Sequence, residues 1–258
     1  MYSVPASQRY SQLSSGRSQF LDMAVECSEL TLPYLVQHDN ATKQGKKHLT
    51  QPWQSVGAKS VVTLAAKLML ALLPPQTSFF KLQVRDDKLG EDIDPQLRSE
   101  LDLSFSKMER TIMDYIAASQ DRVVVHQALK HLIVSGNALI FMGKEGLKHY
   151  PLQRYVVNRD GNGNVIEIVT KELISRKLLK LEPNPTDKVN QNLTGSDGDD
   201  AEVYTCVKLD PSSGRWNWYQ EVDDQIIPES RSSAPKNASP WLPLRFNTVD
   251  GEDYGRGR

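Results

Sequence analysis

The sequence DRVVVHQALKHLIVSGNALIFM, residues 121 to 142, marks the point where the chain changes from helices to strands. Its first part has apolar residues at helical spacing from Asp121 onward, and Gly136 can take the left-handed conformation that ends a helix. Residues 137 to 142 then predict a short buried strand. The helix is expected to bury Val124, Val125, Ala128, Leu129, Leu132 and Ile133.

Two further helices are expected upstream, over residues 19 to 37 and from Pro52 to Leu73. The first has one apolar face and is interrupted by Pro33. The second begins after a cap at Thr50, stops at a Pro-Pro pair, and is predicted to be a buried scaffold. Its small residues permit close approach of another backbone: Gly57, Ala58, Ala65 and Ala66. Residues 79 to 84 show the alternation of a strand.

The cleanest amphipathic helix begins at Asp94-Pro95, where an N-cap residue precedes a proline in the first turn. Large apolar residues then recur at steps of three or four, which places them on one helix face. That face consists of Leu97, Leu101, Phe105, Met108, Ile112 and Ile116.

The second half of the chain reads as antiparallel hairpins, so the predicted fold class is α+β. One hairpin joins residues 152–160 to 164–172 around Gly161-Asn162-Gly163, and another joins 202–209 to 215–222. A last strand is expected near residues 242–246, and residues 181–200 read as a surface loop. The expected organisation is a flexible tail (1–18), a mainly helical part (19–150) and a mainly β part (151–258).

The charge balance argues against tight binding of nucleic acid. The 258 residues include 31 Lys plus Arg against 32 Asp plus Glu. Tight binding to nucleic acid comes from neutralising phosphates, which requires a basic surplus. Any contact with DNA is therefore expected to be loose, or local, or made by a surface of mixed charge.

Cysteine usage and hydropathy indicate a reduced protein without a membrane segment. Cys27 and Cys206 match no zinc or redox spacing, and both are expected to be free thiols. The N-terminus is too polar for a signal peptide. The apolar stretch from Val56 to Leu73 carries Lys59 and Lys67, and we read it as a helix of the protein rather than of a membrane.

No catalytic signature is found. The chain has no Walker A loop, GxSxG, HExxH or Rossmann glycine pattern. Gly161-Asn162-Gly163 lies in a hairpin rather than before a helix, so it is not expected to hold phosphate. His126 and His131 lie about 140° apart around their helix and are not expected to share a metal ion. We predict a protein that is not an enzyme and has no catalytic, cofactor-binding or metal-binding residues and no cofactor.

Two other groups of residues leave alternatives open. Two acidic groups could be paired carboxylates but are expected to be solvated surface, namely Glu26 with Glu29, and Glu91 with Asp92 and Asp94. Asp197, Asp199 and Asp200 alternate like ligands of a calcium loop, but the closing Glu and the flanking helices are lacking, so calcium binding is not expected. Strand alternation places Trp216 and Trp218 on one face and Tyr219 on the other. This cluster fits either base stacking, a subunit contact or the packed face of a sheet, and the last is favoured.

Several segments, in order, resemble the portal (head-to-tail connector) proteins of short-tailed bacteriophages. They cover most of residues 19 to 258 and correspond to the N-terminal half of that family. The segments are QPWQSVGAKSVVTLAAKLMLALLPPQT (51–77), MERTIMDYI (108–116), ALKHLIVSGNALIF (128–141), YVVNRDGNGNVIEIVTKE (155–172) and VDGEDYGRGR (249–258).

The resemblance implies a structural subunit of a twelve-membered ring at the unique capsid vertex of the virion, assembled in the host cytoplasm. Double-stranded DNA would enter and leave through its channel. The implied partners are further copies of the chain, the major capsid protein, a tail adaptor, the terminase during packaging and internal core proteins. Family members are about twice as long, so the resemblance covers their wing and not their stem, clip or crown. The alternatives are a non-specific nucleic-acid-binding protein and an enzyme with an unrecognised site.

Overall fold

The computed structural model describes residues 4–38, 51–52, 54–75, 77–83, 95–175, 179, 200–227 and 229–257. In these residues helices come first and antiparallel strands follow, which confirms the predicted α+β class. The helices are α1 (Ala6–Leu30), α2 (Ser55–Leu72), α3 (Pro95–Ala118) and α4 (Asp121–Ser135). The strands are β1 (Asn137–Gly143), β2 (Gly146–Tyr150), β3 (Tyr155–Arg159), β4 (Val165–Ser175), β5 (Asp200–Asp210), β6 (Arg215–Val222), β7 (Gln225–Ile226), β8 (Ser232–Pro235) and β9 (Trp241–Arg245).

The strands form two antiparallel sheets. The smaller sheet has the order β2-β1-β9, and the larger has the order β3-β4-β5-β6-β7 with β8 also paired to β6. Both predicted hairpins are confirmed, since β3 pairs with β4 and β5 with β6. Strand β9, predicted near its observed place, pairs with β1 and so connects the last part of the chain to the end of the helical half.

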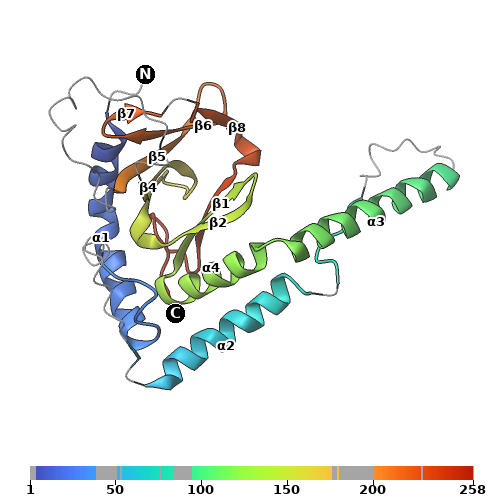
Figure 1. The fold of residues 1–258 in the computed structure, drawn as a ribbon, viewed down its shortest axis with the longest axis horizontal. Coiled ribbons are helices and arrows are strands. Elements are labelled where there is room, and N and C mark those ends of the chain that lie inside the picture. Colours follow the sequence, from blue (N-terminus) through green and yellow to red (C-terminus); the bar gives the residue numbers. More distant parts are fainter. Residues whose placement is uncertain are drawn as a thin grey trace.

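The helices α1 and α4 pack on these sheets and complete what we call the body, residues 6–38, 121–175 and 200–257. Helix α1 runs beside the larger sheet, and α4 lies against β1 and β2 (Figure 1). The main core joins apolar side chains of α1 to those of both sheets, among them Leu21, Leu139, Ile168 and Trp241. Helix α2 packs along α4 through Val61, Ala65 and Met69.

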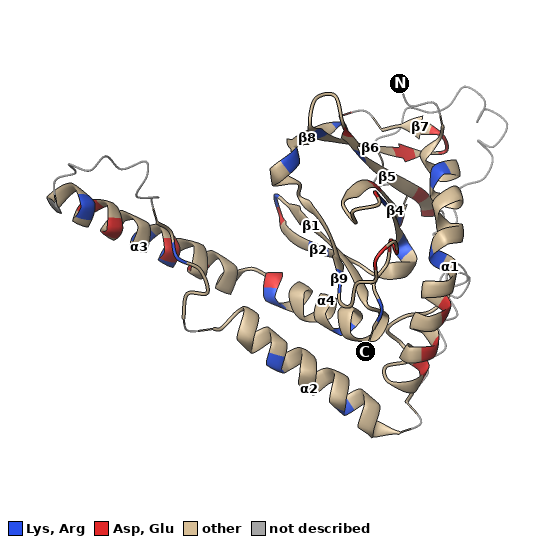
Figure 2. Ribbon diagram, turned by 180° about the vertical axis from the view of Figure 1, so that it is seen from behind, with Lys and Arg blue, Asp and Glu red and all other residues tan. Residues whose placement is uncertain are grey.

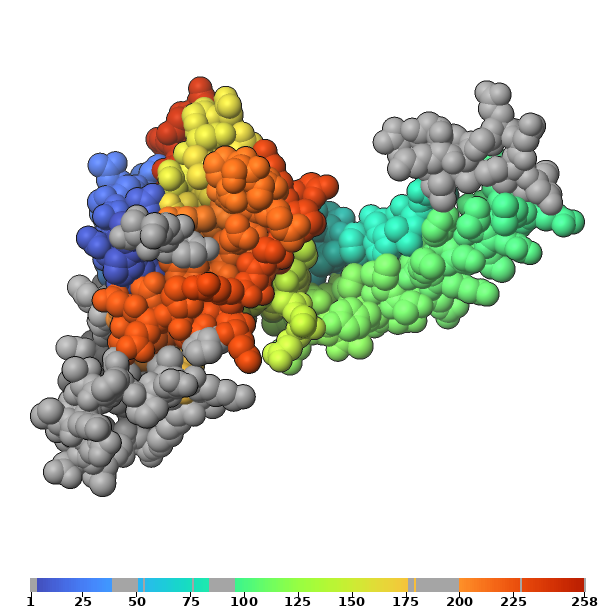
Figure 3. All heavy atoms as spheres, turned by 90° about the horizontal axis from the view of Figure 1, so that it is seen from above, coloured from blue at the N-terminus to red at the C-terminus, as the bar shows by residue number. Residues whose placement is uncertain are grey.

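Helix α3 projects away from the body, roughly continuing the line of α4 (Figure 1). Seen from above, its far end reaches well beyond the sheets (Figure 3). None of its residues from Gln96 to Ala118 is buried. We call α3 together with residues 77–83 the arm.

The transition from helix to strand occurs where the sequence predicts it. Helix α4 ends at Ser135, and Gly136 follows with a φ of 72°. This left-handed conformation favours glycine because it has no Cβ to clash with the backbone. Strand β1 begins at the next residue. Gly57 also permits the expected close approach, since a Cβ there would lie 2.8 Å from the carbonyl oxygen of Leu30.

Four expectations on the helical half are corrected. Residues 6–18 are helical rather than a flexible tail, because α1 begins at Ala6 and packs on the larger sheet. Helix α2 begins at Ser55, capped by the Gln54 side chain, whereas Thr50 lies outside the described residues. Residues 79–83 pair with no strand and have no regular structure. Helix α2 is not a buried scaffold, since Val61, Ala65 and Met69 alone of its residues are buried.

Candidate assembly surfaces

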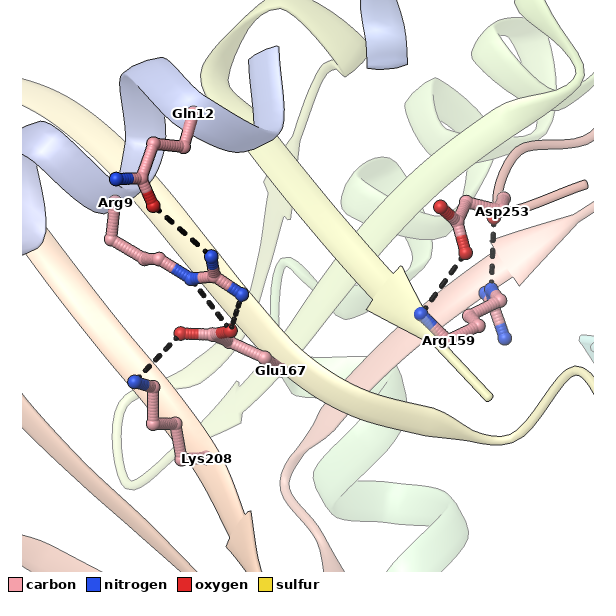
Figure 4. Close-up of polar contacts among 6 residues, drawn as sticks. All are labelled: Arg9, Gln12, Arg159, Glu167, Lys208 and Asp253. Atoms are coloured by element: carbon pink, nitrogen blue, oxygen red, sulfur yellow. Dashed lines mark hydrogen bonds and ion pairs between the residues drawn. The ribbon is translucent and has the colours of Figure 1, made fainter. Parts of the chain in front are cut away.

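The first half of α1 is tied to the larger sheet by charged side chains. Arg9 donates from Nε and Nη2 to one oxygen of Glu167, at 2.9 and 2.7 Å (Figure 4). Lys208 Nζ lies 3.1 Å from the other oxygen of this carboxylate. Burial of the Glu167 side chain, which is 5% exposed, makes this carboxylate depend on both cations.

A second link is made by the buried side chain of Arg17. Its Nη1 donates to the Tyr10 hydroxyl and to the carbonyl oxygens of Leu152 and Tyr155, each at 2.9 Å. These partners are more than a hundred residues away along the chain, apart from Tyr10. The polar side chains of α1 therefore hold the body together rather than form a binding site.

The segment 249–257 is held against α4 and β1. The Asn137 side chain donates to the carbonyl oxygen of Gly255 and accepts from its N–H, both at 2.7 Å. The buried Tyr254 hydroxyl accepts from the N–H of Val157 at 2.9 Å. Asp253 accepts from Arg159 through its carboxylate and its carbonyl oxygen (Figure 4). A side chain at Gly136 would collide with this segment, 2.2 Å from the Arg256 carbonyl carbon.

A polar pocket of about 440 Å³ lies between the turn at residues 160–163 and residues 245–253. Its two arginines are already engaged, because Arg159 donates to the carbonyl oxygens of Gly163 and Pro243 and Arg245 to that of Glu252. The wall also contains several carboxylates, among them Asp250. This mixture of charges selects neither an anion nor a cation, and the glycines serve the hairpin turn.

The rings of His131 of α4 and His149 of β2 lie against each other at an interplanar angle of 42°, with centroids 4.5 Å apart. Burial and the charges of His149 and Lys130 lower the pKa of His131 to about 3, and burial lowers the pKa of His149 to about 4. Both rings are therefore neutral near pH 7. Burial also lowers the pKa of His126, which lies apart from this pair. Within the described ranges, no three His, Cys, Asp or Glu side chains are grouped to hold a metal ion.

The aromatic hairpin is packed rather than free. Trp216 is buried in the main core, with Trp218 partly buried against it, and Tyr219 is buried in a separate cluster on the opposite face. This confirms the predicted alternation and the interpretation as a packed sheet. Cys27 and Cys206 are free thiols.

Three of the predicted acidic residues lie in the part of the chain that the structure describes, and all three are exposed. Glu26 and Glu29 are exposed on α1, and Asp200 is exposed at the start of β5. The remaining members lie outside the described residues: Glu91, Asp92, Asp94, Asp197 and Asp199.

Helix α2 and the arm carry many exposed apolar side chains. In the described part of the chain, α2 alone is long and apolar enough to cross a membrane by length and composition. Exposed large apolar side chains include Val56, Val62 and Leu70 of α2, and Leu97, Leu103, Met108, Ile112 and Tyr115 of α3. The sequence predicted one apolar face on α3, but it did not predict that this face lacks a partner within the described chain. These surfaces are candidates for contact with other chains.

Comparisons with known proteins support an assembly role. A family described as "Bacteriophage head to tail connecting protein" matches residues 5–258. The chain is 37% identical to the portal protein of Enterobacteria phage T3, and the match covers 97% of this chain and 47% of the relative. Identity to the portal proteins of Escherichia phage T7 and Enterobacteria phage SP6 is 36% and 33%, with 96% of this chain and 47% of each relative covered. The chain thus spans about half the length of these curated relatives.

Proposed function

The chain belongs to the family of bacteriophage head to tail connecting proteins, and on this premise we propose that it is a structural subunit of a portal ring at the unique capsid vertex. The ring, expected to contain twelve copies, would form the conduit for packaging and ejecting DNA. Its outer end would be the docking point for tail proteins. The expected location is the virion, with assembly in the host cytoplasm.

The observation that carries this proposal is the continuity of the match. Similarity to portal proteins extends over 96 to 97% of the chain. The matched region therefore includes the helical half, the hairpins and the packed segment 249–257. We propose that residues 6–150, which include all of α1, and residues 151–258 are the mainly helical and mainly β parts of the portal wing, joined by the pairing of β1 with β9.

The charge balance supports a conduit that does not hold its DNA. A channel that passes any sequence must avoid base readout and extensive phosphate neutralisation. With 31 basic and 32 acidic residues, this chain has no surplus of positive charge. The proposed partners are the major capsid protein, a tail adaptor, the terminase, internal core proteins and double-stranded DNA.

The proposed role is structural. The family description names a connecting protein, in agreement with the expectation that the chain is not an enzyme. We propose that any energy for DNA movement comes from a separate motor, and that the purified chain hydrolyses no ATP.

The test is the state of the purified chain in solution, measured by light scattering and electron microscopy. We expect closed rings, and duplex DNA binding that has no sequence preference and weakens steeply as salt approaches physiological levels. A chain that stays monomeric and binds DNA tightly in physiological salt would contradict the portal assignment. That result would favour the alternative, a dedicated nucleic-acid-binding protein.

A further inference from the structure

The stripe on α3 is a continuous apolar surface. At 100° per residue, its seven large side chains fall within a sector of about 100° on the helix. Within this sector, Met108 is 53% exposed and Ile112 is 40% exposed. The stripe consists of Leu97, Leu101, Phe105, Met108, Ile112, Tyr115 and Ile116.

Another side of α3 is covered by its own chain. Residues 77–83 run along it, and the Leu82 N–H donates to the Glu109 carboxylate at 2.5 Å. A shallow groove between this segment and the helix is lined by Ser78, Arg110 and Met113, among others. Arg110 and Met113 lie outside the sector of the stripe, so the covering segment leaves the stripe open.

Packing within the described chain does not account for the stability of α3. Helix α3 has 24 residues and is therefore about 36 Å long. Most helical stability in proteins comes from burying an apolar face, and α3 buries no residue whose burial is described. A stripe of this length and about 10 Å wide approaches the largest apolar patch that monomers normally expose. Such a surface is a candidate contact for another chain.

The chain itself carries a matching surface on α2. The side of α2 away from α4 exposes Val56 and Leu70 together with Lys59 and Lys67, and α2 contains no acidic residue. Helix α3 carries four acidic and three basic residues. Figure 2 shows this difference, with blue alone on α2 and both colours on α3. The two helices thus have net charges of opposite sign, +2 on α2 from its two lysines and −1 on α3, and both expose apolar side chains.

We propose that the apolar stripe of α3 packs on the outward face of α2 of a second copy of this chain. The proposal rests on the portal assignment and names the surface through which its subunits associate. Because α3 and α2 are different surfaces, the contact is head-to-tail, which is the kind of contact that closes into a ring when the rotation allows. The near-neutral chain places little electrostatic repulsion against such contacts.

The test compares the assembly of four proteins by light scattering over a concentration series. In the double variant Met108→Glu/Ile112→Glu, two charges enter the stripe, and we expect association at least about 100-fold weaker than in the unaltered chain. The double variant Lys59→Glu/Lys67→Glu adds negative charge to the α2 face and should weaken association by at least about 10-fold.

The matched control is Leu103→Glu, because Leu103 is 58% exposed on α3 but lies outside the stripe. We expect it to assemble like the unaltered chain, and all variants to keep the helix content and thermal midpoint of the monomer. Equal assembly of the stripe variant, equal weakening by the control, or an unaltered chain that is monomeric up to about 1 mM would overturn the proposal.

Two outcomes separate this inference from the portal assignment. If rings form but resist the stripe substitutions, the interface is wrong and the ring assignment stands. If the stripe drives assembly into open filaments rather than rings, the interface stands and the ring assignment fails. Normal assembly of the Lys59→Glu/Lys67→Glu variant would overturn the pairing with α2.

Discussion

The body buries its apolar side chains within the chain, whereas the arm leaves an apolar face uncovered. In the body, residues far apart in sequence meet in closed cores, and buried polar groups such as Arg17 and Asn137 have partners across the fold. In the arm, an equally regular apolar pattern faces outward along α3. Amphipathic periodicity therefore predicts that a face will be covered, but not whether the same chain covers it.

The largest difference in unfolding free energy is expected between two leucine variants, one in the body and one in the arm. Leu139 is fully buried in the main core, with 0% exposure. Leu139→Asp would bury an unpaired carboxylate, and we expect a loss of more than about 4 kcal/mol in unfolding free energy, so that little folded protein remains. Leu103→Asp on the arm should cost about 0.5 kcal/mol, mainly through helix propensity. Urea unfolding of both variants measures these free energies, and similar losses of unfolding free energy would refute the division into body and arm.

Acid should destabilise the body through the buried pair His131 and His149. The folded-state pKa values of His131 and His149, about 3 and about 4, lie below the ordinary value of 6.5. Both rings take up protons more readily in the unfolded chain, so their contribution is intact above pH 6.5 and is lost as the pH falls toward 4. The loss approaches about 1.4 kcal/mol per pH unit for each ring.

The pH effect can be isolated with one substitution. His149→Phe keeps an aromatic ring at that position but removes one of the two titrating groups. Between pH 7 and pH 4.5, we expect this variant to lose about 2 kcal/mol less unfolding free energy than the unaltered chain. Urea midpoints at several pH values provide the measurement, and an unchanged pH dependence would exclude this role for the pair.

A smaller loss is expected when the anchor of α1 is removed. Arg17→Ala leaves the buried carbonyl oxygens of Leu152 and Tyr155 without this donor, which should cost about 2 kcal/mol. The matched change on the arm is Lys107→Ala, where the side chain is exposed and the expected cost is near zero. Hydrogen exchange should show faster exchange in the first half of α1 for Arg17→Ala. Protection equal to that of the unaltered protein would show that α1 does not need this anchor.

The smallest expected changes in stability come from two helical glycines, and the two substitutions should act in opposite directions. Gly16 of α1 faces open space, so Gly16→Ala should stabilise the protein by about 0.5–1 kcal/mol through helix propensity. Gly57 of α2 faces the carbonyl oxygen of Leu30, 2.8 Å from the position of an added Cβ. Gly57→Ala should therefore lose about 1 kcal/mol rather than gain. Thermal midpoints of the two variants give both signs, and stabilisation by both would mean that α1 and α2 do not depend on close contact.

Local signals predicted much of the fold. Gly136 and the apolar run after it predicted the end of α4 and the start of β1, and the turn glycines predicted both long hairpins. These features depend on residues close together in the sequence, where backbone preferences decide the structure.

Features that depend on distant partners were missed. Residues 6–18 are too polar to predict a packed helix by periodicity, and they are held by Arg9 and Arg17 to strands β4 and β3, more than a hundred residues away. Residues 79–83 alternate like a strand but pair with no strand among the described residues. For the candidate interface, the sequence predicted the stripe on α3, whereas its exposure follows from the direction in which α3 leaves the body.

The pairing of Asn137 with Gly255 also has a mechanical consequence. Tension applied to the chain beyond Arg256 would load the two Asn137 hydrogen bonds and the bridge between Asn247 and Arg256 first. The force would then pass to the end of α4 and to β1, before it reached the hairpins of the larger sheet. Helix α4 is therefore the element through which a pull on this end of the protein would be transmitted toward α2 and the arm.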